Sequence, residues 1–311
     1  MDITLAKPPF ATALDGTLPS RPSTFRHWIE ERRGARFRPE PGRYQLYVSY
    51  GCPWAHRTLI VRALKGLEAC IGVTAVHHRL DSRTGWAFAP GRPEPLYGLS
   101  FLAQLYTMAE PDYRGRITVP VLWDTQERTI VNNESADIMR MLGRVFDRFA
   151  QRPGVDLVPA AQRAQIERWN ERILQAVNAG AYAAGFADAQ GPYSAAEARF
   201  FAMLDELELH LGRQRFLVGD QPTEADWRLF PTLVRFAWVY HGLFRLNRRA
   251  LADYPHLSAY SRALYQWPGI AATVDEHQIR DGYWSSMAWL NLSGVVPPGP
   301  SFDFTLPHGR A

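Results

Sequence analysis

Short runs of β-branched and aromatic residues recur in the first half of the chain. Such runs, bounded by glycine and proline, predict β-strands. They lie at residues 44–50, 71–78, 117–123 and 129–131. The first run is broken by Gly51-Cys52-Pro53, and the apolar positions over 59–64 that follow are typical of a helix. Residues 81–112 are rich in proline and glycine and are predicted to be irregular.

The hydrophobic period changes to about 3.6 residues in the second half, which indicates helices that pack through one face. Beyond a first helix over 135–142, the predicted helices cover residues 160–189, 195–211, 227–244 and 257–266. An α/β unit followed by a helical unit implies two domains, with a break near Arg152-Pro153-Gly154. The domains that we expect are an N-terminal extension over 1–42, an α/β domain over 43–145, a helical domain over 155–290 and a loop tail over 291–311.

Composition narrows the class of protein. The 311 residues are 46% hydrophobic, which is enough for a folded core, and the formal net charge is +4. Basic residues are spread along the chain, so neither nucleic acid nor a membrane surface is an expected partner. The apolar runs favour neither a signal peptide nor a membrane-spanning helix. Two cysteines are too few for a disulfide framework, and we expect a protein of the reducing cytoplasm.

Cys52 lies in the motif with the clearest chemical meaning, Gly-Cys-Pro-Trp-Ala-His-Arg at 51–57. Proline suits the first turn of a helix because its missing N–H would be unpaired there, which puts Cys52 at the N-cap. Unpaired amides and the helix dipole stabilise a thiolate at that position, so Cys52 is a candidate nucleophile rather than a small buried turn residue. Ala55 stands where a Cys-x-x-Cys motif has its second thiol, which favours exchange with an external thiol. Cys70 has no such context and is expected to be inert core.

Two further motifs suggest a binding site. Pro120, in Thr-Val-Pro-Val at 118–121, cannot continue a β-ladder and implies an edge strand, a bulge or a cis peptide bond. Asn133-Glu134-Ser135 leads into a predicted helix, where an acid and a hydroxyl can receive an α-amino group and an α-carboxylate. The same residues would also serve as an ordinary helix cap. Thr-Glu-Ala-Asp at 223–226 matches a helix N-capping box, which is a structural feature.

Together these motifs resemble the glutathione transferase superfamily and, within it, the Xi class of glutathionyl-hydroquinone reductases. The resemblance covers about residues 20–300. In the first half it rests on Cys-Pro-Trp-Ala-His-Arg at 52–57, Gly-Trp-Ala-Phe at 85–88, Gly-Arg-Ile-Thr-Val-Pro-Val-Leu-Trp-Asp at 115–124 and Ile-Val-Asn-Asn-Glu-Ser at 130–135. In the second half it rests on Gly-Phe-Ala at 185–187, Arg-Phe-Leu-Val-Gly at 215–219 and Tyr-Gln-Trp-Pro-Gly-Ile at 265–270.

The resemblance implies a thioredoxin-like α/β N-terminal domain followed by an all-α glutathione-transferase C-terminal domain, assembled as a homodimer. It implies glutathione as co-substrate and no metal. Cys52 matches the nucleophile of the family. The residues that match its glutathione contacts are Trp86, Arg116, Val119, Glu134 and Ser135. Three tyrosines match those that the family places near the thiolate, namely Tyr182, Tyr240 and Tyr283; without the resemblance they would be interpreted as core packing.

The chain departs from the family pattern at a few positions. Tyr283 is followed by Trp284 and then Ser285-Ser286, where many members have a second tyrosine and a Ser-His pair. Leu246 often has a cysteine counterpart. These positions lie near the substrate mouth by analogy, so the hydroquinone ring and its substituents stay open.

The activity implied by the resemblance is reduction of glutathionyl-hydroquinones to hydroquinones through a mixed disulfide between Cys52 and glutathione. The alternatives are a conventional glutathione-conjugating transferase, a dehydroascorbate or thiol-transfer enzyme, and a catalytically silent binding protein of the same fold. Cysteine argues against conjugation, because it tends to form a mixed disulfide with glutathione, whereas serine or tyrosine hydrogen-bonds the glutathione thiolate. Retention of the nucleophile, the glutathione contacts and all three tyrosines argues against the silent protein.

Overall fold

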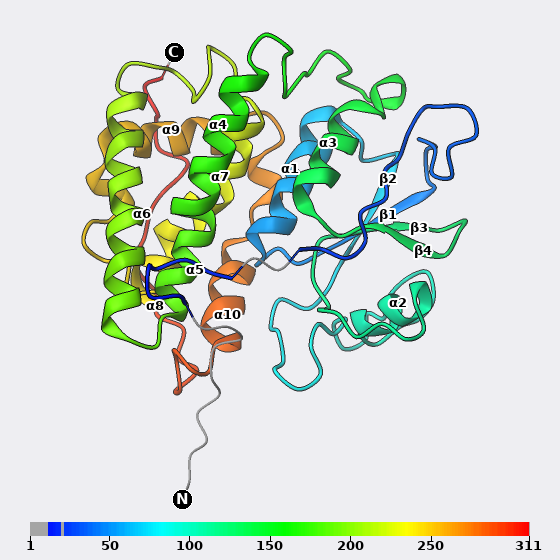
Figure 1. Ribbon diagram of the computed structural model, residues 1–311, viewed down its shortest axis with the longest axis horizontal. Coiled ribbons are helices and arrows are strands. Elements are labelled where there is room, and N and C mark those ends of the chain that lie inside the picture. The colour runs from blue at the N-terminus through cyan, green and yellow to red at the C-terminus, as the bar shows by residue number, and fades with distance from the viewer. Residues whose placement is uncertain (1–11, 20–21, 311) are drawn as a thin grey trace, which may run out of the picture. The chain divides into compact units, whose positions relative to one another are not determined.

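The chain forms two compact units, seen in a computed structural model that describes residues 12–19 and 22–310 (Figure 1). The N-terminal unit consists of residues 22–156 and 268–282. The described part of the helical unit consists of residues 12–19, 157–267 and 283–310. Residues 1–11 and 20–21 of the expected N-terminal extension lie outside the described residues.

A four-stranded mixed sheet forms the centre of the N-terminal unit. Its strands, in the order β2-β1-β3-β4, are β2 (Ile71–Ala75), β1 (Tyr44–Val48), β3 (Val121–Asp124) and β4 (Thr129–Asn132). Strand β1 pairs parallel with β2 and antiparallel with β3, which pairs antiparallel with β4. All four predicted strands are present, but β3 starts at Val121 rather than at Ile117. The Val119–Pro120 peptide bond is cis, and a proline has no N–H to give to the ladder.

Four segments meet at one end of this sheet. Tyr47 near the end of β1 pairs with Val121 at the start of β3, and Leu122 pairs with Asn132 at the end of β4. The parallel strand β2 also ends on this side. The turns after β1, before β3 and after β4 are therefore neighbours, and they carry the three motifs that the sequence analysis identified.

Helices cover both faces of the sheet. Helices α1 (Pro53–Lys65) and α3 (Ser135–Arg144) pack together on one face, and α2 (Leu102–Ala109) lies on the other (Figure 1). Helix α2 lies inside the segment that we predicted to be irregular, so that prediction was wrong for these eight residues. Leu102, Leu105 and Tyr106 are its buried positions. These apolar positions span only about one and a half helical turns. That is too short for a helical period to be recognised among the flanking prolines and glycines.

The helical unit confirms the all-α second half of the expected fold. Its helices are α4 (Arg163–Ile173), α5 (Ala179–Phe186), α6 (Gln190–Leu211), α7 (Glu224–Arg235), α8 (His241–Leu243) and α9 (Pro255–Tyr265). Helix α10 (Glu276–Ser286) begins in the N-terminal unit and ends in the helical unit. Short 3₁₀ turns occupy Asp147–Phe149, Leu251–Asp253 and Ala271–Thr273. The predicted capping box is confirmed, with Asp226 accepting hydrogen bonds from Thr223.

Two π-helical turns, Leu174–Asn178 and Phe236–Tyr240, interrupt what the sequence predicted as single helices. The first joins α4 to α5, and the second joins α7 to α8. An i to i+5 turn inserts a residue without breaking the hydrophobic stripe, so the periodicity does not reveal it.

The described parts of the N-terminal extension pack on their own chain. In the helical unit the hydroxyl of Thr12 donates to the carbonyl oxygen of Ala183 over 2.8 Å. In the N-terminal unit Arg26 forms a β-bridge with Asn132, and Phe25 and Ile29 are buried. These parts of the extension therefore need no partner subunit to cover them. Within residues 12–19 and 22–310, no helix combines the length and the hydropathy needed to cross a membrane.

Candidate active site

Cys52 is the N-cap of helix α1, as predicted. Its backbone is extended (φ −78°, ψ 120°), and Pro53 opens the helix. The first turn of this fully described helix has no acidic side chain. The Sγ atom lies 3.6 Å from the carbonyl oxygen of Val119. The nucleophile candidate and the residue before the cis-proline thus meet in one site, where the amides of a helix N-terminus favour a thiolate.

Val119 offers a backbone donor at this point. The residue is 6% exposed, and among the described residues its N–H has no hydrogen-bond partner. A buried amide without a partner costs free energy, which a bound peptide-like group can recover by pairing with it.

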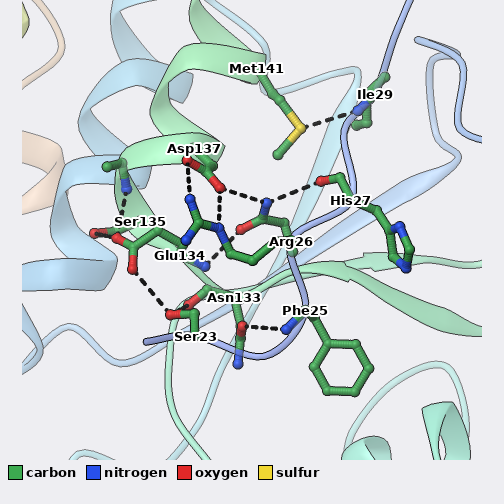
Figure 2. A network of polar contacts seen from close by, with 12 residues as sticks. Ser23, Phe25, Arg26, His27, Ile29, Asn133, Glu134, Ser135, Asp137 and Met141 are labelled. Atoms are coloured by element: carbon green, nitrogen blue, oxygen red, sulfur yellow. Dashed lines mark hydrogen bonds and ion pairs between the residues drawn. The ribbon is translucent and has the colours of Figure 1, made fainter. Parts of the chain in front are cut away.

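Glu134 is the N-cap of α3, and its two carboxylate oxygens face different partners (Figure 2). Oε1 accepts from the Ala136 N–H over 3.2 Å and from the Ser135 hydroxyl over 3.4 Å. Oε2 accepts from the hydroxyl of Ser23 over 3.0 Å. The capping role that we allowed for is therefore confirmed, and it occupies only one side of the carboxylate.

Trp86 and Arg116 lie on loops of the same unit. Trp86 stands between two isolated β-bridges, Asp81 with Gly85 and Ala87 with Phe101, and its carbonyl accepts from the N–H of Leu102. Arg116 is exposed and precedes the cis-proline segment, where its carbonyl accepts from the Tyr113 hydroxyl over 3.0 Å. Their contact with glutathione stays a prediction.

The three predicted tyrosines come together in the helical unit. The hydroxyl of Tyr283 lies 2.5 Å from that of Tyr182 and 2.8 Å from that of Tyr240. The hydroxyls of Tyr240 and Tyr182 are 3.4 Å apart. Burial, followed by the neighbouring Tyr283, raises the pKa of Tyr240 well above its ordinary value. The phenol of Tyr240 therefore stays protonated at neutral pH, and hydrogen bonds link the three hydroxyls.

Sequence reasoning missed the π-helical turns beside two of these tyrosines. Tyr240 is the last residue of one, and the other ends at Asn178, next to the helix of Tyr182. Such turns are frequent at functional sites because they reorient the side chains near them. The buried Asn178, which donates to the Thr232 hydroxyl over 2.7 Å, was the polar signal in an otherwise apolar stretch.

Leu246, which often has a cysteine counterpart in the family, lies next to the tyrosine cluster along the backbone. It is 0% exposed, and its N–H donates to the carbonyl of Tyr240 over 3.3 Å. Its place near the substrate mouth stays a prediction.

Comparisons with known proteins identify the family of the chain. The glutathione S-transferase N-terminal domain family matches residues 51–145, and the glutathione S-transferase C-terminal domain family matches residues 163–263. The chain is 47% identical to the glutathionyl-hydroquinone reductase PcpF of Sphingobium chlorophenolicum, over 86% of each chain.

Solved structures show the same relationship. The glutathione-bound structure of YqjG from Escherichia coli K-12 superposes with a TM-score of 0.89 at 45% identity, covering 92% of this chain and 96% of that chain. The Xi glutathione S-transferase of Phanerochaete chrysosporium gives a TM-score of 0.90 at 44% identity, covering 95% and 96% of the two chains. The chain therefore belongs to the Xi class of the glutathione S-transferase family and is an enzyme of that family.

Proposed function

We propose that this enzyme reduces glutathionyl-hydroquinones to hydroquinones with glutathione as the reductant, in the cytoplasm. The observation that carries the proposal is Cys52 at the N-cap of α1 with its sulfur beside Val119. The names of the relatives PcpF and YqjG, both glutathionyl-hydroquinone reductases, support the same activity. A cysteine at this position favours disulfide chemistry over conjugation.

The chain offers a single thiol for this chemistry. Ala55 replaces the second cysteine of a dithiol motif. Cys70 precedes β2, which puts it at the opposite end of the sheet, and burial raises the pKa of its thiol. A single thiolate can act only by taking glutathione from the substrate and then giving it up to a second thiol.

In the first step the Cys52 thiolate attacks the sulfur of the glutathionyl adduct. A disulfide forms between Cys52 and glutathione, and the bond between that sulfur and the ring carbon breaks. The ring carbon keeps the electron pair and must take a proton. The sulfur is oxidised and the ring is reduced by two electrons.

In the second step a glutathione thiolate attacks the mixed disulfide. Oxidised glutathione leaves, and the Cys52 thiolate is restored. The proton released by this glutathione replaces the one consumed at the ring, so the sum is one adduct plus one glutathione giving hydroquinone plus oxidised glutathione. This order predicts ping-pong kinetics.

We assign the proton transfer to the tyrosine cluster. Tyr182 is the least buried of the three phenols and is the proposed donor to the ring. Tyr283, hydrogen-bonded to both of the others, is placed to return a proton to Tyr182. Phenols can also donate hydrogen bonds to a thiolate and so favour its charged form.

Glutathione is proposed to lie along the end of the sheet, with its sulfur towards Cys52 and its γ-glutamyl end at Glu134 and Ser135. The backbone of Val119 would pair with the peptide, and Trp86 and Arg116 would complete the contacts. In this arrangement Glu134 receives the α-ammonium group, while Ser135 and the first amides of α3 receive the α-carboxylate.

Replacing Glu134 by alanine is expected to weaken glutathione binding by about 2 kcal/mol, because the charged partner of the α-ammonium group is lost. The Michaelis constant for glutathione should then rise by about thirtyfold. The matched control is Glu127→Ala, which removes an exposed carboxylate from the β3–β4 turn at the other end of the sheet. A Michaelis constant that stays the same in Glu134→Ala would refute the assignment.

A homodimer is proposed from membership of the family alone. Light scattering at micromolar concentration should give a mass of about twice the 35.3 kDa of one chain. A mass equal to that of one chain would contradict the dimer.

The activity itself is tested by measuring, side by side, turnover of a glutathionyl-hydroquinone with glutathione and conjugation of a chloronitroaromatic. Reduction with little conjugation is the expected result. Conjugation without reduction would overturn the proposal in favour of a conventional transferase, and activity in neither assay would favour a silent binding protein.

A further inference from the structure

The segment Pro22–Ile29 of the N-terminal extension lies against the turn that carries Glu134 (Figure 2). Its backbone continues the sheet: the N–H of His27 donates to the carbonyl of Val131 over 3.0 Å. The N–H of Phe25 donates to the side chain of Asn133 over 3.2 Å, and the Asn133 N–H returns a bond to the Phe25 carbonyl over 3.1 Å. The segment is therefore a fixed part of this turn.

An ion pair anchors the same segment to helix α3. Arg26 donates from Nε to Oδ2 of Asp137 over 2.5 Å and from Nη2 to Oδ1 over 3.0 Å. Asn132 adds a third bond to this carboxylate, over 3.1 Å. Asp137 lies in the first turn of α3, so the pair also neutralises a second negative charge close to Glu134.

Ser23 is the residue of this segment that touches the carboxylate of Glu134. Its hydroxyl lies 3.0 Å from Oε2 and 3.3 Å from the carbonyl oxygen of Asn133. Oε1 is held from the other side by the α3 cap. The carboxylate of Glu134 is therefore oriented by hydrogen bonds from helix α3 on one side and from Ser23 on the other. Its Oε2 atom can still accept a hydrogen bond from a ligand, because an ionised carboxylate oxygen can accept more than one.

We infer that Ser23 is a positioning residue for the γ-glutamyl end of glutathione, acting through the carboxylate of Glu134. The inference rests on the proposed function, in which Glu134 receives the α-ammonium group. A carboxylate that is already oriented loses less side-chain entropy when the ligand binds. Arg26 and its ion pair hold Ser23 in place, which gives the N-terminal segment a role in substrate selection.

The test uses the full-length protein and calorimetry with two probes, S-hexylglutathione and S-hexyl-cysteinylglycine, which differ only in the γ-glutamyl group. Ser23→Ala should weaken binding of the first probe by about fivefold, the scale of one hydrogen bond, and leave the second unchanged. Ser23→Thr, which keeps the hydroxyl, should restore the preference. In steady-state reduction, Ser23→Ala should raise the Michaelis constant for glutathione with kcat little changed.

Thr24→Ala is the matched control. The hydroxyl of Thr24 is the next one along the segment, but it hydrogen-bonds with the hydroxyl of Tyr113 over 3.0 Å instead of with Glu134. Thr24→Ala should therefore bind both probes as tightly as the unmodified protein does. If Ser23→Ala weakened both probes equally, the residue would be merely structural, and if it weakened neither, the inference would be wrong.

Glu134→Ala separates this inference from the proposed function. If Glu134→Ala abolishes the preference for the γ-glutamyl probe and Ser23→Ala does not change it, only the role of Ser23 fails. If Glu134→Ala keeps the preference, the proposed glutathione site itself fails. The double variant should be no worse than Glu134→Ala alone, because Ser23 acts through that carboxylate.

Discussion

Replacing Cys52 by alanine is expected to lower reduction of a glutathionyl-hydroquinone by on the order of 10³-fold or more, as loss of a nucleophile does in covalent catalysis. No other thiol can substitute for it, since Cys70 is buried before β2. Glutathione binding should be largely kept, because the proposed contacts lie on Val119 and Glu134. The measurement is steady-state turnover beside calorimetry with glutathione.

Mass spectrometry gives the sharper readout of the same prediction. Enzyme treated with the adduct alone should gain one glutathione, located on Cys52, because no free glutathione is present to complete the cycle. Cys70→Ala should still be labelled and should still turn over. An unmodified Cys52 in an enzyme that turns over fully would rule out the mixed disulfide.

Replacing Cys52 by serine distinguishes reduction of the adduct from conjugation of glutathione. Cys52→Ser keeps a hydroxyl at the N-cap, which can hydrogen-bond a glutathione thiolate but cannot form a disulfide. It should lose reduction and can uncover weak conjugating activity. Retained reduction in Cys52→Ser would contradict the assignment of the nucleophile.

Much of the N-terminal unit could be predicted because its local signals agree with its tertiary structure. Cys52 and Pro53 mark the end of a strand and the start of a helix without help from distant residues. The meeting of Cys52 with Val119 follows from the antiparallel register of β1 and β3. Strand boundaries were less predictable, since the β-forming residues at 117–119 lie outside the ladder that starts at Val121.

The site features that local sequence patterns alone do not reveal depend on contacts that are distant in sequence. The bond from Ser23 to Glu134 joins residues 111 positions apart, and a serine near the N-terminus carries no local signal of it. The tyrosine cluster joins Tyr182 to Tyr283 across 101 positions. Periodicity places each tyrosine on a helix, but it does not show how the helices align with one another. Only the family resemblance therefore singled out these tyrosines.

Removing single hydroxyls from the tyrosine cluster is expected to slow the first chemical step while leaving the second intact. A general acid typically contributes 10²-fold to 10⁴-fold, so Tyr182→Phe should slow transfer of glutathione to Cys52 by about 10²-fold. Tyr283→Phe should approach this effect, because it removes the hydroxyl that both other tyrosines contact. Tyr240→Phe should have a smaller effect, since this phenol is the most buried of the three.

Single-turnover kinetics of enzyme mixed with the adduct measures the first step, and glutathione added to the preformed mixed disulfide measures the second. The pH profile of the first step should move to higher pH in each variant, because a thiolate that loses a hydrogen-bond donor is harder to form. Tyr265→Phe is the matched control, because it removes a phenol hydroxyl of the same unit from a ring that packs on Phe304. Tyr182→Phe combined with Tyr283→Phe should slow the first step little more than either change alone, since the two hydroxyls act in one proton path.

Equal slowing of both steps would show that the cluster supports the fold rather than the proton transfer. An unchanged first step in all three variants would remove the cluster from the mechanism.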